Sequence, residues 1–186
     1  FALVYFLIII GVIATLEFFK IISLIIKKNV LKKILLNISF SIYIFCFCAL
    51  FLIFSYNLHL IILIFFTLLT CVASDIGGFV FGKIFGGRKL TKVSPNKTIS
   101  GSLGSLIFSG LFVILLTYFL TNQLDLNIII FGLITSVACQ FGDLFFSFLK
   151  RISKIKDTGN FLPGHGGILD RIDGILLGMP IGYLTL

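Results

Sequence analysis

Residues 58–81, LHLIILIFFTLLTCVASDIGGFVF, form an apolar block whose length decides the fold class. An α-helix needs about 20 apolar residues, at about 1.5 Å each, to cross the hydrocarbon core of a bilayer. The rest of the chain has the same character, with a mean hydropathy of +1.19 and 59% hydrophobic residues. This composition excludes an ordinary soluble domain, whose apolar residues recur at helical or strand periods. We predict an all-α protein, a polytopic bundle of transmembrane helices.

Apolar blocks of similar length recur along the chain and predict about six membrane spans. Their bounds are Phe1–Ile26, Ile34–Phe54, Leu58–Phe81, Leu103–Leu120, Ile128–Leu149 and Ile168–Leu186. The first block carries Glu17 and Lys20 on one helix face, so the point where it leaves the membrane stays open. The chain starts without an initiator Met or a basic leader. We therefore expect one membrane domain over residues 1–186, truncated at its N-terminus.

All 15 basic residues fall in three connections between these blocks, at residues 20–33, 83–97 and 150–171. The alternate turns, 55–60 and 121–127, contain none. This alternation follows the positive-inside rule, so we expect the basic connections to face the cytoplasm from a bacterial-type inner membrane. Anionic membrane lipid is then an expected partner. A net charge of +8 would indicate nucleic acid in a soluble domain, but with this placement we expect no nucleic-acid partner.

Polar side chains enter the predicted spans near the basic connections. Asp75 lies about two helical turns before Lys83, at a depth where a carboxylate costs about 2–3 kcal/mol unless it faces water, a cation or a partner. In the fifth block, polar residues recur at three- and four-residue steps and so project from one side of a helix. They are Gln140, Asp143, Ser147, Lys150 and Lys154. We expect a polar cleft open to the cytoplasm; hydrogen bonding between helices is the alternative.

Two carboxylates, Asp170 and Asp173, share a helix face at the start of the last block. Carboxylates this close repel each other unless a cation or a basic partner lies between them. Mg²⁺ takes oxygen ligands and is commonly shared between one or two carboxylates and substrate phosphates. We therefore predict a magnesium site built from Asp143, Asp170 and Asp173. The alternative is a set of helix-end ion pairs with Lys150, Arg151 and Arg171.

Two loops rich in glycine, hydroxyl groups and lysine precede predicted helices. Residues 156–167 read KDTGNFLPGHGG, where Gly and Pro interrupt the helix and leave free N–H groups for an anion at the next helix start. We expect His165 and the amides of Gly166 and Gly167 to contact phosphate; a simple loop histidine is the alternative. Residues 92–101, KVSPNKTISG, follow the same logic but lack the spacing of a P-loop.

Residues 147–173, SFLKRISKIKDTGNFLPGHGGILDRID, resemble the signature of phosphatidate cytidylyltransferases, also called CDP-diacylglycerol synthases. The resemblance extends to residues 74–77, 97–98 and 142–144. The chain departs from it at Ser100 and Phe146, where many relatives place Glu.

The resemblance implies transfer of a cytidylyl group from CTP to phosphatidic acid, giving CDP-diacylglycerol and pyrophosphate, with Mg²⁺ required. It implies that Asp143 and Asp170 hold the metal, with Asp173 and Asp75 as further candidates and a second cation left open. Its implied phosphate-binding residues are Lys150, Arg151, His165, Arg171, Gly166 and Gly167. Its candidates for the nucleotide are Ser94, Lys97 and Thr98.

Other functions and assemblies stay open. A CTP-dependent lipid kinase of the polyprenol or phytol type is the alternative enzyme, and a membrane transporter is the alternative of another class. A transporter predicts polar residues through to the far side, whereas here they stop near the basic ends of the spans. A homodimer is left open.

Overall fold

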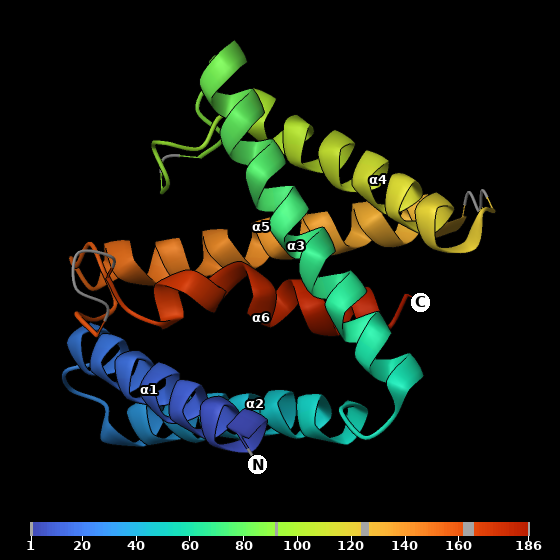
Figure 1. Cartoon of the computed structure of the whole chain (residues 1–186). Coiled ribbons are helices and arrows are strands. Elements are labelled where there is room, and N and C mark those ends of the chain that lie inside the picture. The colour runs from blue at the N-terminus through green and yellow to red at the C-terminus, as the bar shows by residue number, and fades with distance from the viewer. Residues whose placement is uncertain (1, 92, 124–126, 162–165, 186) are drawn as a thin grey trace. The chain divides into compact units, whose positions relative to one another are not determined.

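The computed structural model describes residues 2–91, 93–123, 127–161 and 166–185. Over these residues the fold consists of six α-helices and no β-strand (Figure 1). The helices are α1 (Ala2–Ile25), α2 (Val30–Phe54), α3 (Leu58–Phe85), α4 (Ile99–Thr121), α5 (Asn127–Ile152) and α6 (Leu169–Tyr183). The prediction of an all-α fold is confirmed.

Five of these helices, α1 to α5, are long and apolar enough to cross a membrane. Helix α6 has 15 residues and contains Pro180. At about 1.5 Å per residue it extends roughly 22 Å, less than the hydrocarbon thickness of about 30 Å. The chain is therefore an integral membrane protein with five helices of spanning length and a shorter sixth, whose first turn carries Asp170.

Two helices begin four residues earlier than hydropathy predicts, because polar caps start them. The Asn29 side chain accepts a hydrogen bond from the Lys32 N–H at 3.0 Å and starts α2. The Thr98 hydroxyl accepts one from the Gly101 N–H at 3.0 Å and starts α4. A side-chain acceptor of this kind satisfies one of the N–H groups that a helix start leaves free.

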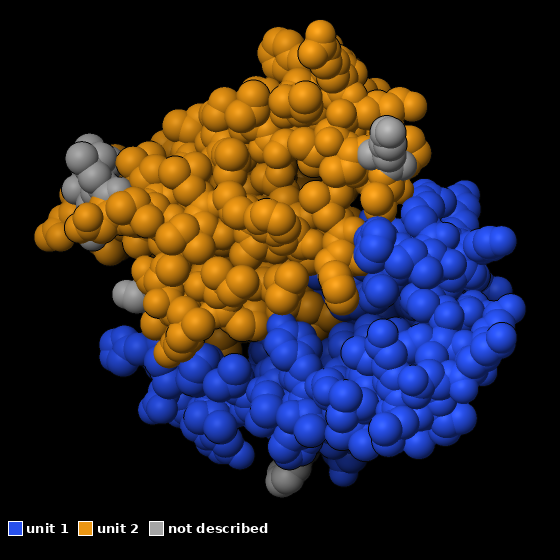
Figure 2. All heavy atoms as spheres, turned by 180° about the vertical axis from the view of Figure 1, so that it is seen from behind, with its two compact units in different colours: residues 1–61, 146–173 blue, residues 62–145, 174–186 orange. Residues whose placement is uncertain are grey.

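The structure divides into two compact units (Figure 2). Unit 1 comprises residues 1–61 and 146–173, and unit 2 comprises residues 62–145 and 174–186. Helices α3, α5 and α6 each contribute to both units. The expected single membrane domain stays a prediction.

In unit 1, α1 and α2 run antiparallel as neighbours (Figure 1) and are joined by aromatic contacts. The rings of Phe18 and Phe40 stack with centroids 3.8 Å apart. The Phe146 ring, from α5, meets Phe40 edge-on at 6.3 Å. Phe146 is one of the two departures from the resembled signature, and here it is a buried packing residue. The start of the predicted catalytic stretch is thus packed against the α1–α2 pair.

In unit 2, glycines allow α3 and α4 to approach backbone to backbone. A Cβ added at Gly77 would lie 2.7 Å from the Gly104 carbonyl oxygen, and one at Gly101 would lie 2.7 Å from the Gly78 carbonyl oxygen. No real Cβ tolerates such distances, so these positions require glycine for the crossing. Small residues at a helix interface are a common way for membrane helices to pack closely.

Candidate functional site

Unit 2 contains a cavity of about 320 Å³ lined by polar side chains from three helices and a loop. Helix α3 contributes Asp75, α4 contributes Ser102 and α5 contributes Asp143. The other polar side chains of the lining belong to Ser94, Asn96, Lys97, Thr98, Ser105 and Gln140. The structure thus brings together six residues that the sequence indicated in separate segments: Asp75, Ser94, Lys97, Thr98, Gln140 and Asp143. The volume lies at the lower end of the range typical of small-molecule sites, about 300–1,000 Å³.

A short antiparallel pairing shapes the loop between α3 and α4. Lys89 forms a bridge with Thr98, and the Leu90 N–H donates to the Lys97 carbonyl oxygen at 2.7 Å. Thr98 also caps α4 through its hydrogen bond from Gly101. Because both ends of this segment are fixed, Lys97 and Thr98 are held at the wall of the cavity.

An ion pair joins two of the predicted site residues. The Lys97 ammonium donates to Asp143 Oδ2, and the two side chains are 27% and 31% exposed. Asp75 lines the same cavity, so two carboxylates face one ammonium group. The charge imbalance favours one further cation among oxygen donors, and Mg²⁺ prefers oxygen donors. The residues of unit 2 therefore fit a magnesium ion that shares its remaining coordination with water or substrate.

Gln140 lines the cavity and forms hydrogen bonds to Ser102 of α4 and to Ser136 of its own helix, α5. It accepts a hydrogen bond from the Ser102 hydroxyl, and its amide donates to the Ser102 carbonyl oxygen at 3.3 Å. The same amide donates to the Ser136 hydroxyl at 3.4 Å, and Ser136 lies 2.7 Å from the Ser74 hydroxyl. Gln140 therefore both lines the polar cavity and joins α5 to α4 through Ser102. These bonds fix α5 one turn away from Asp143.

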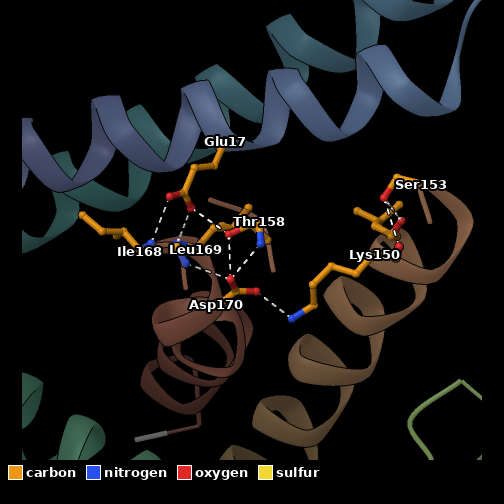
Figure 3. Close-up of polar contacts among 9 residues, drawn as sticks. Glu17, Lys150, Ser153, Thr158, Ile168, Leu169 and Asp170 are labelled. Atoms are coloured by element: carbon orange, nitrogen blue, oxygen red, sulfur yellow. Dashed lines mark hydrogen bonds and ion pairs between the residues drawn. The ribbon is translucent and has the colours of Figure 1, made fainter. Parts of the chain in front are cut away.

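The second polar cluster lies in unit 1 around Asp170 (Figure 3). Asp170 Oδ1 accepts a hydrogen bond from the Lys150 ammonium at 2.7 Å. Asp170 Oδ2 accepts three more, from the Thr158 N–H at 2.8 Å, the Thr158 hydroxyl at 3.0 Å and the Gly167 N–H at 3.0 Å. The side chains of Lys150 and Asp170 are only 14% and 11% exposed. Both oxygens of this carboxylate are therefore bound within the unit.

The hydrogen bonds at Asp170 decide its charge state. Burial by itself would raise the pKa of the Asp170 carboxyl group. The ammonium of Lys150 and the N–H groups of Thr158 and Gly167 outweigh burial and hold this pKa below its ordinary value. Asp170 is therefore a carboxylate at neutral pH, as a cation ligand must be.

Glu17, the one glutamate of the chain, belongs to the same cluster although the sequence did not indicate it as a site residue (Figure 3). Its buried carboxylate accepts hydrogen bonds from the Thr158 hydroxyl at 2.8 Å, the Ile168 N–H at 3.1 Å and the Leu169 N–H at 2.8 Å. A carboxylate inside an apolar helix was the signal available, because such a group needs a partner.

The other predicted site residues of unit 1 differ in their exposure to solvent. Asp173 lies on α6 and is half-buried, whereas Arg151 on α5 and Arg171 on α6 are exposed. Gly166 adopts a positive φ of 83°, and the N–H of Gly167 is used by Asp170. His165 lies outside the described residues.

Two of the predicted metal carboxylates form ion pairs with lysines: Asp143 with Lys97, and Asp170 with Lys150. For Asp170 this is the ion pair that the sequence left as the alternative. Among residues 2–91, 93–123, 127–161 and 166–185, no three His, Cys, Asp or Glu side chains form a ready metal cage. A magnesium ion would therefore depend on water and substrate oxygens, as is usual for this metal. The magnesium site stays a prediction.

The fold and the two clusters define a class: an integral membrane protein with paired carboxylates and ammonium groups, a combination suited to phosphates and their cations. The chain belongs to the cytidylyltransferase family, which it matches over residues 1–186.

Three curated relatives show the degree of similarity. A phosphatidate cytidylyltransferase of Bacillus subtilis is 44% identical over 128 residues, which cover 66% of this chain and 46% of that protein. Those of Helicobacter pylori J99 and Mycobacterium leprae are 39% and 37% identical over 118 and 124 residues. These two alignments cover 62% and 66% of this chain, and 43% and 40% of the respective proteins. The alignments thus span less than half the length of each of these three relatives.

Proposed function

We propose that this chain carries catalytic residues of a phosphatidate cytidylyltransferase, which transfers CMP from CTP to phosphatidic acid and releases pyrophosphate. The family match over residues 1–186 is the observation that carries the proposal. Relatives of that name at 37–44% identity support the choice of substrates. CTP, phosphatidic acid and membrane lipid are the proposed partners.

The proposed reaction makes one bond and breaks one. A phosphate oxygen of phosphatidic acid bonds to the α-phosphorus of CTP, and the bond from that phosphorus to pyrophosphate breaks. The protein's part is to align two anionic substrates and to neutralise their charge. Lys97 would neutralise the triphosphate in the cavity of unit 2, with the hydroxyls of Ser94 and Thr98 as further donors. Lys150, Arg151 and Arg171 are the proposed partners of the lipid phosphate.

Magnesium is the proposed cofactor, with Asp143 and Asp170 as proposed ligands and Asp75 and Asp173 as further candidates. When bound, it would supply charge neutralisation for the nucleotide phosphates and the departing pyrophosphate. To hold the cation, Asp143 would release the ammonium of Lys97, and Asp170 would release that of Lys150. Lys97 would then move from Asp143 to phosphate, because a lysine is a flexible point charge.

We place the basic segments in the cytoplasm, where CTP is available, because all 15 Lys and Arg residues lie within residues 20–33, 83–97 and 150–171, at alternate junctions between successive helices. Trypsin cleaves only after Lys and Arg, so it reports this orientation directly. Trypsin added to inside-out vesicles should cut the chain, for example after the exposed Lys28, whereas trypsin added to spheroplasts should leave it intact. The reverse pattern would refute the orientation.

The activity itself is tested by mixing the purified membrane protein with CTP, phosphatidic acid and Mg²⁺. We expect CDP-diacylglycerol and pyrophosphate in equal amounts, detected by mass spectrometry and a coupled pyrophosphate assay. Diacylglycerol in place of phosphatidic acid should give no product, because it lacks the attacking phosphate. Absence of CDP-diacylglycerol, or phosphorylation of a polyprenol or phytol instead, would contradict the proposal.

A further inference from the structure

We propose that Glu17 is a positioning residue that holds Asp170, through Thr158 and the first turn of α6, in the geometry required to bind a divalent cation. The inference rests on the proposed function for the role of Asp170. It makes the first helix of the chain a part of the catalytic framework in unit 1, in addition to a membrane span.

The Glu17 carboxylate accepts hydrogen bonds from two segments, the loop at Thr158 and the start of α6. Oε2 accepts from the Thr158 hydroxyl and the Leu169 N–H, both at 2.8 Å, and Oε1 accepts from the Ile168 N–H at 3.1 Å. Glu17 is 7% exposed and Thr158 is 1% exposed. In such a buried place a donor that loses its acceptor does not regain one from water, so each bond constrains both partners.

Glu17 and Asp170 bind the same two segments (Figure 3). The hydroxyl of Thr158 lies 2.8 Å from Glu17 Oε2 and 3.0 Å from Asp170 Oδ2. At the start of α6, the N–H of Gly167 donates to Asp170, and the next two N–H groups donate to Glu17. The direction of Asp170 Oδ2 therefore depends on donors that Glu17 holds in place.

The backbone at two glycines, Gly159 and Gly167, packs closely against the Glu17 carboxylate. A Cβ at Gly159 would lie 2.9 Å from Glu17 Cδ, and a Cβ at Gly167 would lie 2.6 Å from Oε1. The backbone on both sides therefore closes on the carboxylate. A tight fit of this kind transmits the position of α1 to the loop, because a packed group has no room to shift.

Replacing Glu17 with glutamine tests this role. The amide keeps the size of the side chain but loses the charge and one of the two acceptor oxygens, so at least one of the three donors loses its partner. Outer-shell partners of metal ligands typically contribute about 10–100-fold to metal affinity or activity. We therefore expect Glu17→Gln to weaken binding of Mn²⁺, a spectroscopic probe for the proposed Mg²⁺, by about 10–100-fold. Electron paramagnetic resonance of the purified protein measures this affinity without turnover.

A matched control separates positioning from general damage to α1. Thr15 lies on the same helix, and its hydroxyl donates only to the Gly11 carbonyl oxygen of that helix. Thr15→Val should leave Mn²⁺ affinity unchanged. Glu17→Asp, which restores the charge, should recover more affinity than Glu17→Gln. If Glu17→Gln does not fold, Thr158→Val takes its place, since it removes the hydroxyl that both carboxylates bind.

The possible results support or overturn the inference. Weaker Mn²⁺ binding in Glu17→Gln, together with a lower kcat and near-normal thermal stability, supports it. Mn²⁺ affinity equal to that of the original protein, or an equal loss in Thr15→Val, overturns it. A protein that binds Mn²⁺ in this Glu17-dependent way but forms no CDP-diacylglycerol refutes the proposed function while the positioning role stands.

Discussion

Replacing Asp143 with asparagine should lower CTP-dependent formation of CDP-diacylglycerol by at least about 10²–10³-fold, the typical effect of removing one group that stabilises charge in a transition state. Asp143 is the acidic partner of Lys97 in the cavity of unit 2. Asparagine retains the shape but has no charge to hold a cation or to place the ammonium. The initial rate at saturating CTP and Mg²⁺ measures the effect.

The control for this variant is a comparison of its membrane insertion and thermal stability with those of the original protein. The Asp143–Lys97 pair is about one-third exposed, so its loss should change stability only slightly. Membrane insertion and thermal unfolding of Asp143→Asn should therefore match those of the original protein. Near-normal turnover in this variant would refute a role for Asp143 in the proposed metal site.

The change Asp170→Asn should remove activity to a similar extent and should also destabilise the protein. Its carboxylate accepts four hydrogen bonds, and the Lys150 ammonium would be left without its partner in a nearly buried place. Breaking a buried ion pair on one side typically costs about 3–5 kcal/mol. Thermal unfolding and product formation, measured on the same preparation, give the two effects.

A double variant separates the effect on stability from the effect on activity. Removing both charges with Asp170→Asn and Lys150→Met leaves no unpaired ammonium, and replacing a whole buried pair is often neutral for stability. We expect the double variant to recover much of the stability but none of the activity. Recovery of activity would show that Asp170 serves only the fold.

Helices α1 to α5 were predictable because their apolar blocks are long enough to cross a membrane. The starts of α2 and α4 were not, since Asn29 and Thr98 are polar and hydropathy does not register a cap. The last block, Ile168–Leu186, was predicted as a sixth membrane span, but α6 runs only from Leu169 to Tyr183 and, with 15 residues, is shorter than the five helices of spanning length.

Part of the candidate site was also predictable from local sequence patterns. Helical periodicity and the resembled signature indicated Asp143, Lys150 and Asp170, which are near one another in sequence or on one helix. Glu17 was not indicated, because its partner Thr158 is 141 positions away and no local pattern connects them. Which lysine pairs with which carboxylate also depends on packing between helices, which a single sequence does not reveal.

The destination of the CTP phosphates tests the central claim most directly. The protein is incubated with phosphatidic acid, Mg²⁺ and CTP that carries one label on the α-phosphorus and a different label on the γ-phosphorus. A cytidylyltransferase predicts the α label in the lipid fraction and the γ label in water-soluble pyrophosphate. Transfer of the γ label to lipid would identify a kinase. Absence of both labels from lipid would show that no phosphate group is transferred to lipid. Either result would contradict the account.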